Sequence, residues 1–341
     1  MQQRTSIADL LKGIAVVLMI QVHIIELFAT PEIFSSSTGS FLLFLGGPFV
    51  APIFAIVFGY FISNSKQTTS QTILRGVQLF FVGILLNISL NFNLLRSVFN
   101  GKIKVNVLDF VFGVDFLLFA GLAIIIIAVL KKILEKRILI TVALSFVVAF
   151  LGHFLVQFQT ENEILTHVSA FIYGNYHWSY FPIFPWMAYP MIGMAISQIH
   201  RKHDLEKIIT QKVQPIIFVI GVLFIGFTIK FGITTSADLQ EYYHHGILFF
   251  CWTISFLIVY GIFIHRVNLS IGNTKVFNYL KWLGKNVTAM YFIQWVFIGN
   301  IGTEVYKSIS SPYILVASFM GILVLSSVVC FYYLKLKRNN L

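Results

Sequence analysis

The first apolar segment of the sequence carries charged and protonatable side chains at helical spacing. Asp9, Lys12, His23 and Glu26 recur at steps that place them on one face of a helix. Lys12 and His23 are eleven residues apart, about three turns, which separates them by roughly 16 Å along the axis. The ammonium group can attract an anion. An imidazole, with an ordinary pKa near 6.5, can accept a proton near neutral pH.

Each of these side chains also has a purely structural interpretation. Lys12 could extend to the lipid headgroups and pair with Asp9, and His23 could be a hydrogen-bonded histidine inside a helix bundle. Their shared face, with Glu26 one turn beyond His23, favours a site. Because ionisable groups within a membrane are costly, each is a candidate functional residue. A long ligand with an anionic head and a reactive far end would reach both groups, and an acyl-CoA has this form.

Membrane helices are the elements that must position these residues. Of the 341 residues, 57% are hydrophobic and only 11% charged, and the mean hydropathy is +0.85; a soluble domain carries about a quarter charged residues. The composition predicts an all-α, polytopic integral membrane protein with about ten transmembrane helices of roughly 20 residues. The span at 179–199 contains three prolines, which indicates a broken helix of the kind that lines a cavity. The expected spans are 7–29, 40–63, 72–92, 107–130, 138–158, 179–199, 213–232, 245–265, 287–308 and 312–334.

The connectors between the spans predict the orientation of the chain. Those after spans four, six, eight and ten are basic, and the alternate connectors, except the one after span three, are poor in Lys and Arg. By the positive-inside rule, both ends of the chain lie in the cytoplasm. We expect the first span to be retained, because no clear cleavage site follows it. The basic residues of these connectors are Lys131, Lys132, Lys136, Arg137, Arg201, Lys202, Lys207, Lys212, Arg266, Lys275, Lys281, Lys285, Lys335, Lys337 and Arg338.

Other function classes receive little support from the sequence. The net charge of +11 belongs to membrane connectors and not to an aqueous basic face, which argues against nucleic-acid binding. Cys251 and Cys330 lie in apolar stretches and form neither a disulfide framework nor a metal-binding pattern. Residues 1–341 read as a single transmembrane domain, so any chemistry must be done by helix faces and short loops.

The first apolar segment resembles the first helix of the transmembrane acyltransferase superfamily. This superfamily includes the acyltransferase-3 membrane proteins and the heparan-α-glucosaminide N-acetyltransferase-like group. Acyltransferase-3 proteins carry a D-x-x-R-G segment followed, eleven residues after the arginine, by a catalytic histidine. Asp9, Lys12, Gly13 and His23 match this frame, with Lys12 in place of the arginine. A lysine attracts a phosphate as a point charge and lacks the bidentate contact of a guanidinium.

Later stretches resemble the N-acetyltransferase-like group. Gln294 stands where one of its segments often has a histidine. The active histidine of that group lies in the loop after span one, and residues 30–40 here contain none, which leaves His23 as the candidate. Residues 47–59 are similar to its second span, and residues 180–194 to its F-P-x-x-P-W span. Residues 283–295 are similar to a segment that usually reads G-K-x-S-L-x-x-Y-x-x-H.

The resemblance implies a membrane-embedded acyltransferase that uses acetyl-CoA and no metal. It would move an acyl group, above all acetyl, from cytosolic acyl-CoA to a hydroxyl or amine of a sugar or glycan outside the membrane. His23 would either remove the acceptor's proton or take the acyl group first, and the sequence leaves both routes open. The candidate residues are His23, Glu26 and Asp109 for catalysis, Lys12, Arg75 and Asp9 for the donor, and Trp186, Tyr180, Gln294 and Tyr291 for the acceptor.

Two alternatives remain at this stage. Broken helices with an intramembrane lysine and histidine also fit a transporter or a lipid-linked glycan flippase, although the chain shows no paired halves. A non-catalytic membrane sensor would not require Lys12 and His23 to share a face. We expect the bacterial cytoplasmic membrane as the location and modification of cell-envelope glycans as the role. The expected partners are acyl-CoA, a glycan and membrane lipids, and formation of a homo-oligomer is left open.

Overall fold

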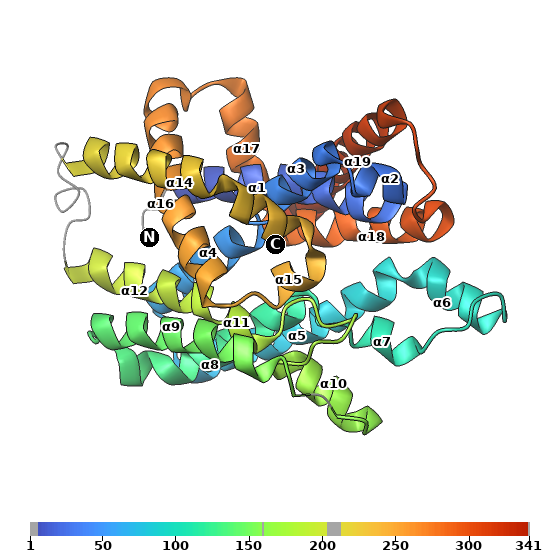
Figure 1. The fold of residues 1–341 in the computed structure, drawn as a ribbon, viewed down its shortest axis with the longest axis horizontal. Helices are drawn as coiled ribbons and strands as arrows, with labels where there is room; N and C mark the ends of the chain where they lie inside the picture. Colours follow the sequence, from blue (N-terminus) through green and yellow to red (C-terminus); the bar gives the residue numbers. More distant parts are fainter. Residues whose placement is uncertain (1–5, 159, 203–212, 340–341) are drawn as a thin grey trace. The chain divides into compact units, whose positions relative to one another are not determined.

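The fold is built from helices. The computed structural model describes residues 6–158, 160–202 and 213–339, which form helices and no strand. Two isolated bridges join Ala29 to Ile309 and Val114 to Ser179. This architecture confirms the predicted all-α class (Figure 1). The shorter helices are α2 Pro31–Phe34, α6 Phe92–Phe99, α7 Val107–Val111, α10 Glu163–Ile172, α15 Leu239–Tyr243 and α17 Lys275–Lys285.

Eight helices of the described residues are long and apolar enough to cross a membrane. Each coincides with one of the predicted spans, because long apolar runs are the strongest signal a sequence gives. One of the eight, Ser37–Asn64, joins α3 Ser37–Gly46 and α4 Ala51–Asn64. The other seven are α1 Ser6–Phe28, α5 Thr69–Leu90, α8 Phe116–Leu134, α9 Ile138–Leu155, Gln214–Ala237 within α14 Val213–Ala237, α16 Ile247–Ile271 and α19 Pro312–Asn339.

The remaining two predicted spans are less regular. The span at 179–199 is divided into α11 Ile183–Trp186 and α12 Ala188–Lys202, as its prolines suggested. The span at 287–308 is α18 Val287–Val305, which is helical but carries several polar residues. A count of ten spans and an inward location of both ends therefore stay predictions. Two of the connector lysines used for the orientation, Lys207 and Lys212, lie outside the described residues.

The predicted span at 107–130 differs from the structure at its beginning. The helix is interrupted between α7 and α8, and Asp115 is the N-cap of α8. Its Oδ1 accepts a hydrogen bond of 2.6 Å from the backbone N–H of Phe116. An aspartate at this position satisfies a helix-terminal N–H that has no partner within the helix. The sequence alone offered no partner for this carboxylate.

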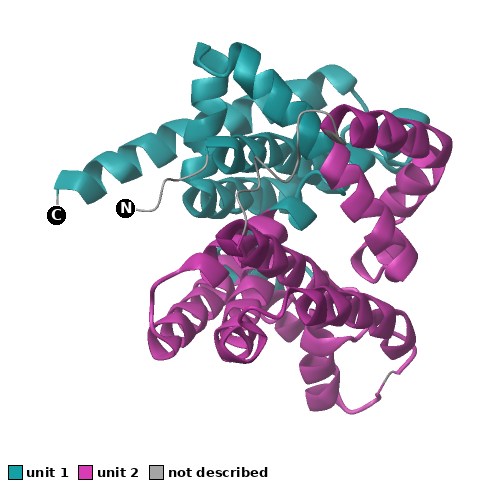
Figure 2. Ribbon diagram, turned by 90° about the vertical axis from the view of Figure 1, so that its left-hand side faces the viewer, with its two compact units in different colours: residues 1–53, 88–105, 260–341 teal, residues 54–87, 106–259 magenta. Residues whose placement is uncertain are grey.

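Contacts between helices divide the chain into two compact units, coloured separately in Figure 2. Three of the four boundaries fall within α4, α5 and α16, each of which contributes to both units, and the fourth falls in the connector between α6 and α7. The prediction that residues 1–341 form one domain stays a prediction. Unit 1 comprises residues 1–53, 88–105 and 260–341, and unit 2 comprises residues 54–87 and 106–259.

Unit 1 is organised around α1, which packs against α3, α17, α18 and α19. Two glycines allow α1 and α17 to approach backbone to backbone. A Cβ atom added at Gly13 would overlap the carbonyl oxygen of Leu280, and one added at Gly284 would overlap that of Asp9. Small residues permit such close helix contacts in membrane proteins. The glycine after Lys12 in the first-helix frame therefore has a packing role.

Unit 2 contains α9 packed against α8, α11 and α12. Here too, glycines mark a close helix crossing. A Cβ atom at Gly59 of α4 would meet the backbone of Pro190, and one at Gly193 of α12 would meet the backbone of Ile56. At the end of α11 the chain buries Trp186, whose indole N–H donates a 2.7 Å hydrogen bond to the carbonyl oxygen of Tyr243.

Candidate active site

The cytoplasm-proximal end of α1, in the predicted orientation, holds a buried ion pair. Lys12 Nζ lies 3.0 Å from Asp9 Oδ1, and the two residues are only 8% and 1% exposed. A lysine this buried does not extend to lipid headgroups. Asp9 compensates the positive charge of Lys12. An anionic ligand would therefore have to displace Asp9 from Lys12 or bind Lys12 together with Asp9.

About one and a half turns from the other end of α1, which is Phe28, His23 forms a dyad with Glu26. His23 Nδ1 lies 3.1 Å from Glu26 Oε2, and both side chains are largely buried. An ionised carboxylate can only accept, so Nδ1 is assigned as the donor and carries the hydrogen. In the neutral imidazole this leaves Nε2 with its lone pair. The arrangement is that of a base oriented by a carboxylate, and it can accept a proton from a ligand.

Trp295 of α18 is the third member of this cluster. Its ring centroid lies 3.9 Å from that of His23, with 37° between the ring planes. Gly302 of α18 also lies beside α1, where an added Cβ would be in ordinary contact, 3.5 Å, with Leu27 and Phe28. The sequence analysis missed Trp295, although it follows Gln294 directly in a stretch that resembles a family segment.

The two acceptor-binding candidates of α18 are buried in unit 1. Gln294 is fully buried, and its Nε2 donates to the carbonyl oxygen of Tyr291 at 3.3 Å. The Gln294 Oε1 atom is buried and accepts no hydrogen bond within the described part of the chain. Tyr291 is 5% exposed. Unit 1 thus contains Asp9, Lys12, His23, Glu26, Tyr291 and Gln294 among the predicted site residues.

Asp109 belongs to unit 2, where its partners are two histidines. Its carboxylate lies 3.2 Å from His167 Nε2 and 3.6 Å from His177 Nε2. The shorter contact is an ion pair by distance but lacks hydrogen-bond alignment. The Nδ1 atom of His167 lies 2.9 Å from the carbonyl oxygen of Glu163.

The aromatic acceptor candidates of unit 2 have different environments. Trp186 is fully buried, between the rings of Phe181, Tyr189 and His245 among others. Tyr180 is 43% exposed and contacts the edge of Tyr243. Tyr180 therefore offers a surface to a sugar, whereas Trp186 serves packing in this conformation.

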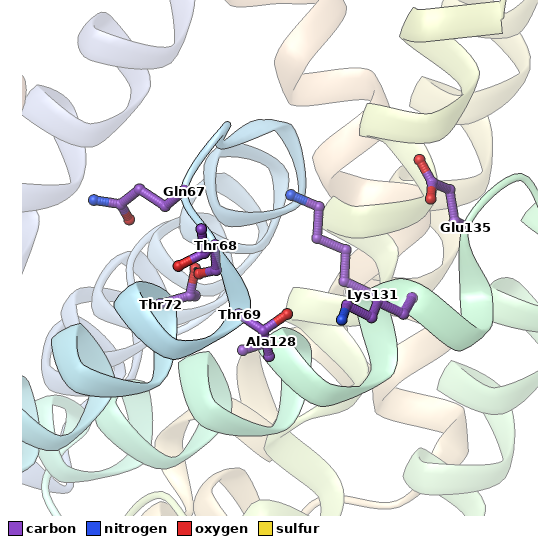
Figure 3. Close-up of a pocket in the computed structure, with 8 residues that line it drawn as sticks. Gln67, Thr68, Thr69, Thr72, Ala128, Lys131 and Glu135 are labelled. Carbon is purple, nitrogen blue, oxygen red and sulfur yellow. The ribbon is translucent and has the colours of Figure 1, made fainter.

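Arg75, the second donor-binding candidate, lies exposed on α5. Near the start of the same helix the surface has a hollow of about 320 Å³ (Figure 3). Lys131 and Lys132 line it together with Glu135, and Lys131 Nζ donates a 2.6 Å hydrogen bond to the carbonyl oxygen of Ser65. The sequence analysis assigned these lysines to orientation and did not predict the hollow. The remaining lining residues are Gln67, Thr68, Thr69, Thr72 and Ala128.

Among the residues that the structure describes, no group of three or more His, Cys, Asp or Glu side chains could hold a metal ion. A family model described as heparan-alpha-glucosaminide N-acetyltransferase, catalytic, matches residues 4–231. This range contains α1 with both of its charged pairs, and it ends before α17 and α18. Neither the curated proteins nor the solved structures gave a match.

Proposed function

The chain belongs to the heparan-alpha-glucosaminide N-acetyltransferase catalytic family, a family of acetyltransferase-type integral membrane enzymes, and from this premise we propose its reaction. The protein transfers an acetyl group from cytosolic acetyl-CoA to a hydroxyl or amine of a sugar or glycan on the other side of the membrane. The observation that carries this proposal is the His23–Glu26 dyad on the same helix as the Asp9–Lys12 pair.

The dyad supplies the proton transfer that the reaction needs. Glu26 holds the hydrogen on Nδ1, so Nε2 of His23 accepts the proton of the acceptor's O–H or N–H. The acceptor atom forms a bond with the thioester carbon, the C–S bond breaks, and the proton passes from His23 to the departing sulfur. In a second route, Nε2 itself attacks the thioester carbon, and the C–S bond breaks to release the CoA thiolate. The acceptor atom then attacks the acyl carbon, the bond to Nε2 breaks, and the acceptor's proton ends on the thiolate. Both routes begin at the same nitrogen.

The anionic end of the donor is assigned to Lys12 and Arg75. Lys12 lies about three turns from His23 on the same helix, which suits a donor whose phosphates and thioester are separated by a long arm. Asp9 limits the attraction by compensating the lysine charge, as their 3.0 Å contact indicates. Arg75, exposed in unit 2, is a separate candidate for the phosphates, because a guanidinium can bind them through paired hydrogen bonds.

The acceptor candidates are taken unit by unit: Tyr180, Asp109 and Trp186 in unit 2, and Gln294 and Tyr291 in unit 1. Tyr180 offers an exposed ring, and aromatic rings bind the apolar faces of sugars. Asp109 carries a carboxylate that accepts hydrogen bonds from hydroxyl or ammonium groups. Gln294 has a buried Oε1 that accepts no hydrogen bond from the described residues. Tyr291 and Trp186, both buried, would contribute by holding these groups in position.

The test uses purified protein in detergent or nanodiscs with radiolabelled acetyl-CoA. Glucosamine, N-acetylglucosamine, glucose and short glycan fragments serve as acceptors. We expect acetyl transfer by the wild type and a loss of roughly 100-fold or more in His23→Ala. The matched control is His153→Ala, an exposed histidine of α9, which should keep wild-type activity. Undiminished transfer by His23→Ala would refute the site assignment, and no transfer by the wild type would refute the function.

A further inference from the structure

Trp295 has a polar atom that its packing does not explain. Its indole Nε1 is buried, and within the described residues it donates no hydrogen bond. Buried indole N–H groups usually have a partner, because leaving one unpaired costs free energy of desolvation. By contrast, the indole N–H groups of Trp186 and Trp252 donate to Tyr243 and Thr228. The N–H of Trp295 is therefore a donor available to a group that the described residues do not supply.

This donor lies beside the proposed base. The Trp295 ring lies against His23, tilted by 37° with a centroid separation of 3.9 Å, while Glu26 occupies Nδ1 of the same imidazole. A ligand atom that reaches Nε2 of His23 is then close to the face of Trp295 as well. An acceptor group on the ligand would satisfy the buried N–H and remove the cost of leaving it unpaired.

We infer that Trp295 is a second catalytic residue, whose indole N–H donates a hydrogen bond to the carbonyl oxygen of the transferring acyl group. This inference rests on the proposed acyl transfer at His23. It adds a residue that lies outside the range of the family match, residues 4–231.

The reaction balances with these two groups. The acceptor's oxygen or nitrogen forms a bond with the thioester carbonyl carbon as His23 Nε2 takes its proton. The carbonyl π electrons move to oxygen, and the indole N–H stabilises the resulting negative charge. When the carbonyl re-forms, the C–S bond breaks, and the imidazolium returns its proton to the thiolate. The products are the acylated acceptor and free CoA thiol.

A donor in this place raises the rate because it binds the charged intermediate more strongly than the neutral thioester. Removal of a single donor to such an oxyanion typically lowers kcat by roughly 100- to 1000-fold. The alternative is that Trp295 only holds the His23 ring. That role depends on the ring and does not depend on the N–H.

The test therefore removes the N–H and keeps an aromatic ring. The assay measures acetyl transfer from radiolabelled acetyl-CoA to glucosamine, or to water if glucosamine is not accepted. In Trp295→Phe we expect kcat of this transfer to fall roughly 100-fold. The KM for acetyl-CoA should change little, because the lost hydrogen bond forms mainly in the transition state. The control is Trp282→Phe in the same unit, whose ring stacks on Tyr279; it should keep wild-type kcat.

The outcomes separate this inference from the proposed function. Wild-type kcat in Trp295→Phe, together with loss of activity in His23→Ala, overturns the role of Trp295 and leaves the function intact. Full activity in His23→Ala, or none in the wild type, overturns both.

If Trp295→Phe does not fold, Trp295 is replaced by 3-benzothienylalanine, which keeps the bicyclic ring and substitutes sulfur for N–H. Loss of kcat in that folded protein supports the donor role, and retention of kcat refutes it.

Discussion

At the scale of single residues, the imidazole of His23 is held from two directions. Glu26 is three residues away on the same helix and contacts Nδ1 at 3.1 Å. Trp295 comes from a helix far along the chain and covers the ring. The first contact was predictable from helical spacing. The second depends on how α18 docks on α1, which no local pattern in the sequence specifies.

Glu26→Gln tests the assigned tautomer. The amide keeps the size of the side chain, but its NH₂ group can donate to Nδ1 and so move the imidazole hydrogen to Nε2. We expect kcat for acetyl transfer to fall by about 100-fold or more, because Nε2 then no longer accepts a proton. The measurement is the pH profile of kcat for wild type and variant.

Glu32→Gln is the matched control for that substitution. Glu32 lies exposed at the beginning of α2 in the same unit, so the change there should leave kcat within about twofold of the wild type. Equal activity of Glu26→Gln and Glu32→Gln would show that the carboxylate of the dyad does not determine the tautomer used in the reaction.

At the scale of elements, the approach of α1 and α17 depends on two glycines. In Gly13→Ala the new Cβ would overlap the carbonyl oxygen of Leu280, and backbone atoms cannot move aside as a side chain can. We expect a loss of about 1–3 kcal/mol or more in stability, measured as a lower unfolding temperature of the detergent-solubilised protein. Gly321→Ala in α19 is the control, because an added Cβ there meets no atom within 4 Å. An equal effect of both substitutions would argue against the tight crossing.

Helix positions were more predictable than helix interruptions. Hydropathy located the long helices because about 20 apolar residues are needed to cross the hydrocarbon core. The end of the helix before Asp115 was missed, since an aspartate inside an apolar run gives no local sign that it caps the next helix. The partners of Asp109 were missed for a related reason. His167 and His177 belong to a later helix and loop, and only tertiary packing brings them to that carboxylate.

The loop before α16 predicts a pH dependence of stability. Burial lowers the pKa of both His244 and His245 to about 4. Neutral His245 donates from Nδ1 to the carbonyl oxygen of Tyr242 at 2.8 Å and accepts at Nε2 from the Tyr189 hydroxyl at 2.9 Å. Between pH 6.5 and about 4 the unfolded chain binds protons that the folded chain does not. The contribution is therefore present above pH 6.5 and is lost as the pH falls towards 4, by up to about 3 kcal/mol per histidine.

His245→Asn isolates the buried imidazole. The asparagine keeps a donor for Tyr242 and removes the titrating group, so we expect a smaller fall in unfolding temperature between pH 7 and pH 5 than in the wild type. His153→Asn, at an exposed site, should keep the wild-type slope. An unchanged slope in His245→Asn would mean that other groups carry the acid sensitivity.

At the scale of the whole molecule, composition determined the class of the protein and left its arrangement to packing. Long apolar helices with few charges require a bilayer, and the family match agrees with an integral membrane enzyme. The two compact units were not visible in the sequence, because three of their four boundaries fall inside α4, α5 and α16, and only the one between residues 105 and 106 falls in a connector.

The orientation in the membrane is the remaining prediction at this scale. Basic connectors such as the one after α8 should face the cytoplasm, and the acidic segment before α10 should face outward. Single cysteines are placed at Glu135 and Glu161 in a background of Cys251→Ser and Cys330→Ser, which removes both native thiols. In intact cells, a membrane-impermeant maleimide should label Glu161→Cys, and it should label Glu135→Cys only after permeabilisation. If only Glu135→Cys were labelled in intact cells, the predicted orientation would be wrong. Acetyl-CoA would then have to reach Lys12 from the outer side.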